Sequence, residues 1–169
     1  EALNGAGLLN LDGTVLSLNS GLYTGVIAGS GSLVKSLSGV LALGGNNTFA
    51  GGVTLSGGTV LVGNDAAFGV GTLTMSGGLV SSNGADARVI GNTLSLSGGI
   101  TLGDSVNNGT LTFNGNAGLT LATTLTVASD VVSSGVISGG TSLTKQGAAT
   151  LTLNGVNTYT GATTVSAGS

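Results

Sequence analysis

Side chains able to perform acid–base chemistry are few in this sequence, and they stand far apart. The chain has 169 residues with six carboxylates, three cationic side chains, and no histidine or cysteine. A zinc site, a thiol nucleophile and a Ser-His-Asp triad are therefore excluded. Apart from Glu1, the carboxylates are five isolated aspartates: Asp12, Asp65, Asp86, Asp104 and Asp130.

Asp86 and Asp104 are the pair that a repeating coil could bring together, with Arg88 beside them. Paired carboxylates act as acid and base in polysaccharide hydrolysis, so this trio could form an acidic sugar site or a cation site. A surface ion pair worth less than about 1 kcal/mol is the simpler interpretation, and we prefer it. We accordingly assign no catalytic, cofactor-binding or metal-binding residue, and we expect neither an enzyme nor a cofactor.

The sequence gives only partial support to three further binding functions, namely calcium binding, ice binding and sugar stacking. Calcium-binding β-rolls need an aspartate at a fixed place in each Gly-rich repeat, and the fragments 44–47 and 63–65 do not recur. Thr-Leu-Thr elements occur in ice-binding solenoids, but here their spacing is irregular. Aromatic side chains could stack on sugars, although packing in the core is their commoner role. They are Tyr23, Phe49, Phe68, Phe113 and Tyr159.

The composition also restricts the partners. A net charge of −3 with three Lys and Arg residues offers no basic surface, so we expect no nucleic-acid partner. Polar residues or glycine interrupt every apolar stretch well before the ~20 residues of a transmembrane helix, so we expect no membrane insertion. The chain opens at Glu1 without a basic and apolar leader, which predicts a mature or excised segment.

The spacing of apolar residues predicts an all-β protein. Apolar residues recur at every second position in short bursts, for example at 41–43, 73–75, 111–113 and 151–153, and this is the period of a strand. Pairs such as Gly-Gly, Asn-Gly and Ser-Gly bound the bursts and favour turns. Helices would be penalised by the 34 glycines, at up to about 1 kcal/mol each relative to alanine.

A long internal repeat predicts how these strands are arranged. Residues 25–58 align without a gap to residues 135–168, with roughly 16 of 34 positions identical where about 4 are expected by chance. Lys35 and Lys145, the two lysines of the chain, occupy equivalent positions. The recurring Asn-Thr-Phe/Tyr-x-Gly places Asn47 and Asn157 at corners, where we expect their side chains to bind their own backbone and stack from rung to rung.

The offset between the two copies divides into five turns of about 22 residues, a typical length for one coil of a β-helix. We predict a single β-helical domain over residues 1–169, with about seven rungs of ~22 residues. Leu, Val and Ile should stack inside, Thr and Ser should face water, and Gly and Asn should form the corners. A Gly-rich β-sandwich is the alternative.

The second copy resembles the passenger-associated repeat of bacterial autotransporters. The resemblance is carried by residues 140–147, 151–155, 157–161, 163–165 and 167–168. Residues 29–58 resemble a diverged copy, which departs from the pattern at Leu37 and Ser38 and again at Phe49 and Ala50. The resemblance implies a right-handed parallel β-helix that is exported to the surface of a diderm bacterium, usually within a longer adhesin-like passenger and without catalysis.

We therefore expect a structural segment of a secreted or cell-surface passenger, such as an adhesin stalk or an extracellular fibre. Few charges oppose association, so end-to-end stacking into filaments is a further expectation, with surface glycans as other partners. Two alternatives remain open at this point. One is a β-helical enzyme acting on polysaccharide, and the other is an ice-binding or carbohydrate-binding module.

Overall fold

The computed structural model describes all residues from Glu1 to Ser169, and its regular secondary structure is entirely β. The strands are β1 (Leu9–Asn10), β2 (Val15–Leu18), β3 (Gly21–Tyr23), β4 (Ile27–Ala28), β5 (Ser32–Lys35), β6 (Val40–Leu43), β7 (Val53–Leu55), β8 (Thr59–Val62), β9 (Leu73–Met75), β10 (Leu79–Ser82), β11 (Arg88–Ile90), β12 (Leu94–Leu102), β13 (Leu111–Phe113), β14 (Ala117–Val127), β15 (Val131–Ser133), β16 (Ile137–Gly139), β17 (Leu143–Gln146), β18 (Leu151–Leu153) and β19 (Thr163–Val165). Their pairings are all parallel, which confirms the predicted parallel β-helix.

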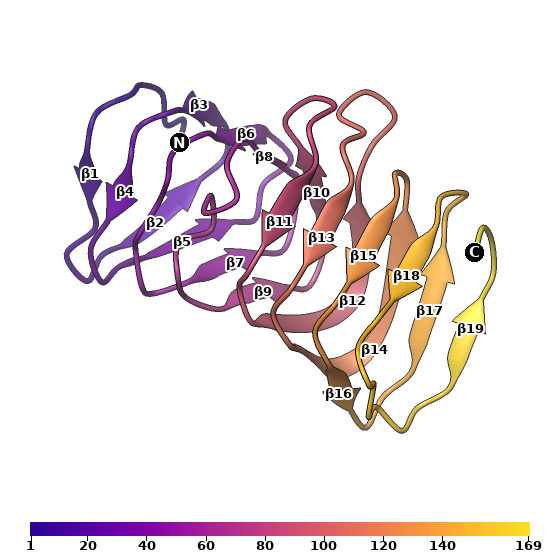
Figure 1. Cartoon of the computed structure of the whole chain (residues 1–169). Helices are drawn as coiled ribbons and strands as arrows, with labels where there is room; N and C mark the ends of the chain where they lie inside the picture. Colours follow the sequence, from indigo (N-terminus) through magenta and orange to yellow (C-terminus); the bar gives the residue numbers. More distant parts are fainter.

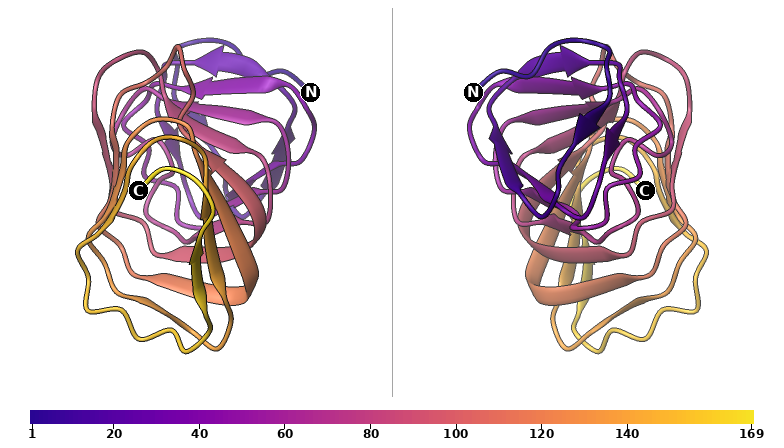
Figure 2. Two further views of the ribbon diagram at one scale, coloured as in Figure 1. Left: turned by 90° about the vertical axis from the view of Figure 1, so that its right-hand side faces the viewer. Right: turned by 90° about the vertical axis from the view of Figure 1, so that its left-hand side faces the viewer.

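Each turn of the coil passes through three faces, which Figure 1 shows from the side and Figure 2 shows along the axis. The first face holds β2, β5, β7, β9, the beginnings of β12 and β14, and β16. The second face holds β3, β6, β8, β10, the ends of β12 and β14, β17 and β19. The long strands β12 and β14 bend around the corner between these two faces and so join them into one sheet.

The third face is interrupted. Its strands fall into two groups, β1 with β4 and β11 with β13, β15 and β18, which Figure 1 shows as separate rows. Between the groups the chain keeps the rung-to-rung hydrogen bonds without forming strands. The Thr48 amide donates to the Ile27 carbonyl, and the Val70 amide donates to the Phe49 carbonyl. A surface cleft, described below, lies at this break in the sheet.

The rungs differ in length along the coil. Leu33 pairs with Val53 near the beginning of the chain, and Lys145 pairs with Val165 near its end. In the middle of the chain Ile100 pairs with Leu125, so more residues separate the two partners there and the rung is longer. Seven turns lie between β3 and β19 on the second face, in agreement with the predicted count of about seven rungs.

The interior is a continuous column of apolar side chains, with 31 buried residues in one cluster. On many strands, such as β9 and β13, alternate residues point inward, as the period-2 pattern requires. Burying one such Leu, Ile or Phe side chain contributes roughly 1.5–3 kcal/mol. Tyr23, Phe49, Phe68 and Phe113 belong to this cluster, and Tyr159 packs against it. The aromatic residues therefore fill the coil, as predicted from their scarcity and scatter.

The hydroxyl side chains do not all behave as expected. Most Thr and Ser on the strands point outward, but Ser81, Ser82 and Thr123 are among those that are buried. Buried hydroxyls need partners. Thr123 donates to the Leu121 carbonyl at 2.9 Å, and Ser82 donates to the Gly84 carbonyl at 2.5 Å. These residues bind turn carbonyls at the corners of the long middle rungs, where the interior is not purely apolar.

The two repeat copies do not lie above one another on the same face. In the first copy β5 belongs to the first face, whereas its equivalent β17 belongs to the second face. Similarly, β7 on the first face corresponds to β19 on the second. The offset between the copies therefore spans five turns and one further face, and not five whole turns as its simple division suggests. The repeat builds a local structure that more than one face of the coil can carry.

Candidate functional site

The most unusual feature of the repeat is a buried lysine. Lys35 and Lys145 are inward-facing strand residues with only 1% and 3% of their surfaces exposed. The Lys35 ammonium donates to the carbonyls of Leu37 and Gly57. The Lys145 ammonium donates to Gly147, Ala149 and Ala167 at 2.6, 2.5 and 2.8 Å. Each lysine thus binds carbonyls of its own turn and of the turn on the next rung.

The unpaired carbonyls at these corners explain why a lysine is buried there. Carbonyls of tight corners cannot all join the ladders between rungs, and an unpaired buried carbonyl is costly. A lysine has three donors on a long apolar stem, so it can lie along the core and still satisfy several carbonyls. Burial lowers the pKa of Lys35. The equivalence of the two lysines was visible in the sequence, but their burial was not.

A glycine completes each lysine site. Gly58 has φ +70° and Gly168 has φ +68°, a conformation that glycine adopts readily and other residues rarely adopt. A Cβ atom on Gly58 would clash with Lys35 Nζ, and one on Gly168 would clash with Lys145 Nζ. The same lysine–glycine contact therefore occurs in both copies, on different faces of the coil.

The recurring asparagine connects rungs. Asn47 is buried, its Oδ1 accepts from the Ile27 amide at 2.8 Å, and its Nδ2 donates to the Ala67 carbonyl at 2.7 Å. Asn157 makes the equivalent first bond, with the Ile137 amide at 2.8 Å. The expectation that these side chains bind their own backbone is thus corrected, because the partners of Asn47 lie on the rungs before and after it.

Asp86, Arg88 and Asp104 do not form a common site. Arg88 pairs with Asp86 at 3.5 Å, and Asp86 is largely exposed. Asp104 instead closes its own loop, where it accepts hydrogen bonds from the amides of Val106 and Asn107 at 2.7 and 2.5 Å. Burial raises the pKa of Asp104, but these bonds and one from the Asn107 side chain outweigh it and hold the pKa below its usual value.

Asp12 and Asp130 also stand alone among the acidic residues. Asp12 is exposed on a turn, and Asp130 accepts from the Thr150 amide on the following rung at 3.0 Å. The structure contains no group of three acidic side chains that could hold a metal ion. The aspartates therefore act singly, and those with partners serve mainly as acceptors for backbone amides.

A surface cleft lies where the third face is interrupted. It has a volume of about 300 Å³ and is lined by Asp65, Ala66, Gly69, Val70, Gly91 and Asn92. Residues 64–68 form a tight turn, since the Ala67 amide donates to the Asn64 carbonyl at 3.0 Å. The turn forms one wall, and the segment around Gly91 on the next rung forms the other. In the sequence Asp65 stands out only as part of a calcium-like fragment, and no motif predicts this cleft.

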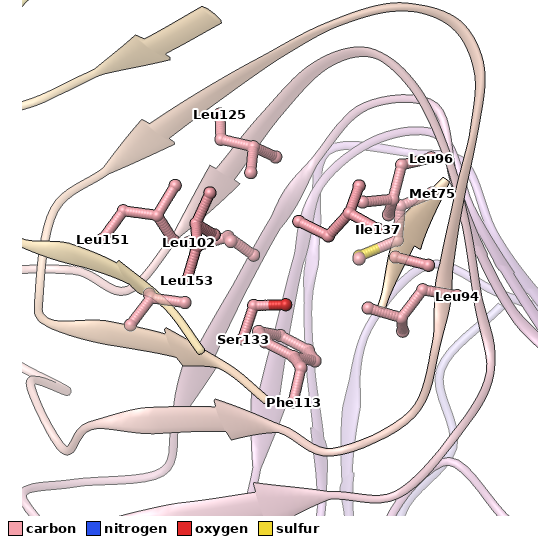
Figure 3. A pocket seen from close by; sticks show the side chains of 12 residues that line it. Met75, Leu94, Leu96, Leu102, Phe113, Leu125, Ser133, Ile137, Leu151 and Leu153 are labelled. Carbon is pink, nitrogen blue, oxygen red and sulfur yellow. The ribbon is translucent and has the colours of Figure 1, made fainter. Parts of the chain in front are cut away.

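A second hollow lies inside the coil and has a volume of only about 20 Å³. Figure 3 shows Leu96, Phe113, Ile137 and Leu151 around it, with Ser133 as the single polar side chain. Such a small apolar space reflects incomplete filling of the wider rungs in the middle of the chain. It offers no polar group for recognition except the Ser133 hydroxyl.

The comparisons with known proteins agree with the repeat geometry. Residues 33–62 and 143–169 match the family model of the passenger-associated-transport-repeat. The adhesin BmaC autotransporter of Brucella suis biovar 1 (strain 1330) is 39% identical over 121 residues, which cover 62% of this chain and 4% of that adhesin. No solved structure matches the chain.

The matched regions coincide with the lysine sites. The first begins two residues before Lys35 and includes Gly58, and the second begins two residues before Lys145 and includes Gly168. The structure has no helix whose length and hydropathy would allow it to span a membrane. The chain therefore carries two passenger-associated-transport-repeats within a parallel solenoid, and it is similar to a small part of an autotransporter adhesin.

Proposed function

We propose that this chain is a non-enzymatic shaft segment of an adhesin-like passenger on the surface of, or secreted from, a diderm bacterium. The observation that carries the proposal is the presence of two passenger-associated repeats in one parallel solenoid. Parallel rungs that pair with their neighbours along the coil resist bending, and each added repeat lengthens the coil. The isolated aspartates support a structural role over the alternative of a polysaccharide-acting enzyme.

The location can be tested in the bacterium that encodes the chain. Antibodies raised against residues 1–169 should label intact cells or the culture medium, and proteinase K added to intact cells should remove the cellular signal. A cytoplasmic protein serves as the control that the cells remain closed. Labelling that needs permeabilised cells, with no antigen in the medium, would contradict the proposal.

A second proposal is that isolated copies of residues 1–169 associate end to end in solution. Within these residues strand β19 pairs only with β17. Val165 on β19 and Leu8 before β1 expose 58% and 74% of their surfaces. Strand edges with apolar side chains favour pairing with another edge. The chain has only three cationic and six acidic side chains in 169 residues, so few charges oppose contact with a second copy.

Sedimentation velocity at increasing concentration tests the association. Val165→Lys should weaken it, because the charge would lie at the free edge. Val106→Lys is the matched control, since Val106 is exposed on a side loop and not at an end of the coil. The same monomer mass for the unmodified chain at all concentrations, or equal association of both variants, would refute end-to-end stacking.

A further inference from the structure

We propose that the cleft between the turn at 64–68 and residues 89–92 binds a neutral saccharide. The inference deepens the proposed adhesin-like function, on which it rests, by giving it a ligand class and a place. The cleft lies on the third face, at the one part of that face where a tight turn replaces a strand between β4 and β11. Its volume of about 300 Å³ is at the lower end of small-ligand sites.

The walls of the cleft are fixed by hydrogen bonds. Asn64 Oδ1 accepts from the Ala66 amide at 2.9 Å and shapes the turn. Asp65 Oδ1 accepts from the Val89 amide at 3.1 Å, which ties the turn to the next rung. Asn92 Nδ2 donates to the carbonyls of Gly69 and Gly71 at 3.1 and 2.7 Å. Both walls are therefore held before a ligand arrives, and preorganisation of this kind reduces the cost of binding.

The polar groups left over in the cleft are acceptors. Asp65 uses one carboxylate oxygen for the Val89 amide, and Oδ2 has no partner within the chain. Asn92 also lines the cleft, and all its side-chain hydrogen bonds involve Nδ2, so its Oδ1 has no partner within the chain. Two positioned acceptors require a ligand that donates, and the hydroxyls of a sugar are such donors.

The charges around the cleft argue against an acidic ligand. Lys35 and Lys145 are buried in the coil, and Arg88 is engaged with Asp86 and with the Val62 carbonyl. No cation is left for a carboxylated or sulfated sugar, and Asp65 would repel it. The single carboxylate also falls short of the six to eight oxygens that calcium needs. A neutral sugar therefore fits the charges best.

The rest of the lining suits the apolar side of a sugar ring. Val70 is exposed beside Ala66, and together they offer a small apolar surface next to the acceptors. Gly91 leaves open space, since a Cβ atom built on it meets nothing within 4 Å. Its φ is not positive, so another residue at this position would be unstrained and would project into the cleft. A large side chain at position 91 would therefore block the cleft without straining the backbone.

The test is an NMR titration of the isotopically nitrogen-labelled protein with the neutral sugars galactose, glucose, mannose, fucose and N-acetylglucosamine. At least one sugar should shift the amide resonances of residues 65–70 and 89–92 in a saturable manner. Gly91→Leu should weaken that binding at least tenfold by filling the cleft, and Asp65→Asn should weaken it by removing the charged acceptor. Gly99→Leu is the matched control, because Gly99 is also exposed and unobstructed but lies on the second face.

Saturable shifts confined to the cleft and lost in Gly91→Leu, with Gly99→Leu unchanged, would support the site. No shift with any of the five sugars, or equal binding by both leucine variants, would overturn it. Shifts with putrescine but with no sugar would replace the saccharide by an amine ligand. Surface labelling of cells is measured independently, so a silent cleft on a surface-exposed chain would refute this inference alone.

Discussion

The Lys35 ammonium occupies the space that a side chain on Gly58 would need, on the next rung of the coil. Lys145 and Gly168 repeat this relationship one face further around the solenoid. The repeat therefore encodes a contact between successive rungs, in which a buried cation binds the carbonyls of two turns. A contact of this kind makes the stability of each rung depend on the next one, as nearest-neighbour coupling in solenoids requires.

Replacing Gly58 with alanine should destabilise the protein by about 1–3 kcal/mol, because the residue has a positive φ and its Cβ would displace Lys35 Nζ. Urea unfolding followed by circular dichroism measures the change. Gly99→Ala is the control, since Gly99 has no positive φ and no neighbour within 4 Å. Equal stability of the two variants would contradict the role given to Gly58.

Lys35→Met keeps the apolar stem and removes the donors. It leaves the carbonyls of Leu37 and Gly57 without this partner, so we expect a loss of about 1–3 kcal/mol in the free energy of unfolding. Arg88→Met, which removes an ion pair with the largely exposed Asp86 and one bond to the Val62 carbonyl, should cost less than Lys35→Met. Chemical denaturation measures both variants. A Lys35→Met protein as stable as the unmodified one would show that the lysine only fills space.

The two equivalent asparagines offer a comparison within one chain. Asn47→Ala removes bonds to both neighbouring rungs and should cost about 2–4 kcal/mol. Asn157→Ala removes the bond to the Ile137 amide in a less buried setting and should cost about 1 kcal/mol. Thermal and urea unfolding of both variants measure the difference. Equal losses would mean that the second rung-to-rung bond of Asn47 adds nothing.

Asp104 predicts a dependence of stability on pH. Its pKa in the folded protein lies below the usual value of 3.8, despite the opposing effect of burial, because Asn107 and Val106 donate hydrogen bonds to the carboxylate. The ionised group therefore contributes stability that is complete above pH 3.8 and is lost as the pH falls through the lowered pKa. Asp104→Asn should show a shallower decline over that range. If the stability of both proteins declines equally as the pH falls, this role of the Asp104 carboxylate is refuted.

Much of the fold was predictable from the sequence. The alternation at 73–75 or 111–113 predicted inward and outward faces, and the repeat predicted a parallel coil, because each rung must pair with its neighbours. The position of the copies on different faces was not predictable, since it depends on the lengths of the individual rungs between them, which differ from one another.

The candidate sites were less accessible to sequence reasoning. The sequence alone does not show whether a lysine on an alternating strand faces the core. However, Gly58 and Gly168 follow the two lysines at the same spacing, and this recurrence could have indicated a contact. The cleft depends on Asp65 and Gly91, which lie far apart in the sequence and meet only because the coil places them on adjacent rungs.

The register of the coil is the most direct test of the account, because the lysine sites, the asparagine bonds and the cleft all follow from it. Thr124 and Thr144 face each other on β14 and β17, and the chain has no native cysteine. Cysteines at these two positions should form a disulfide on mild oxidation, since paired residues on adjacent strands lie about 5 Å apart. The pair Thr124→Cys and Gln146→Cys should remain reduced, because it is displaced along the strand from the observed pairing. Cross-linking of the second pair and not of the first would indicate a longer rung here and would contradict the register on which this account rests.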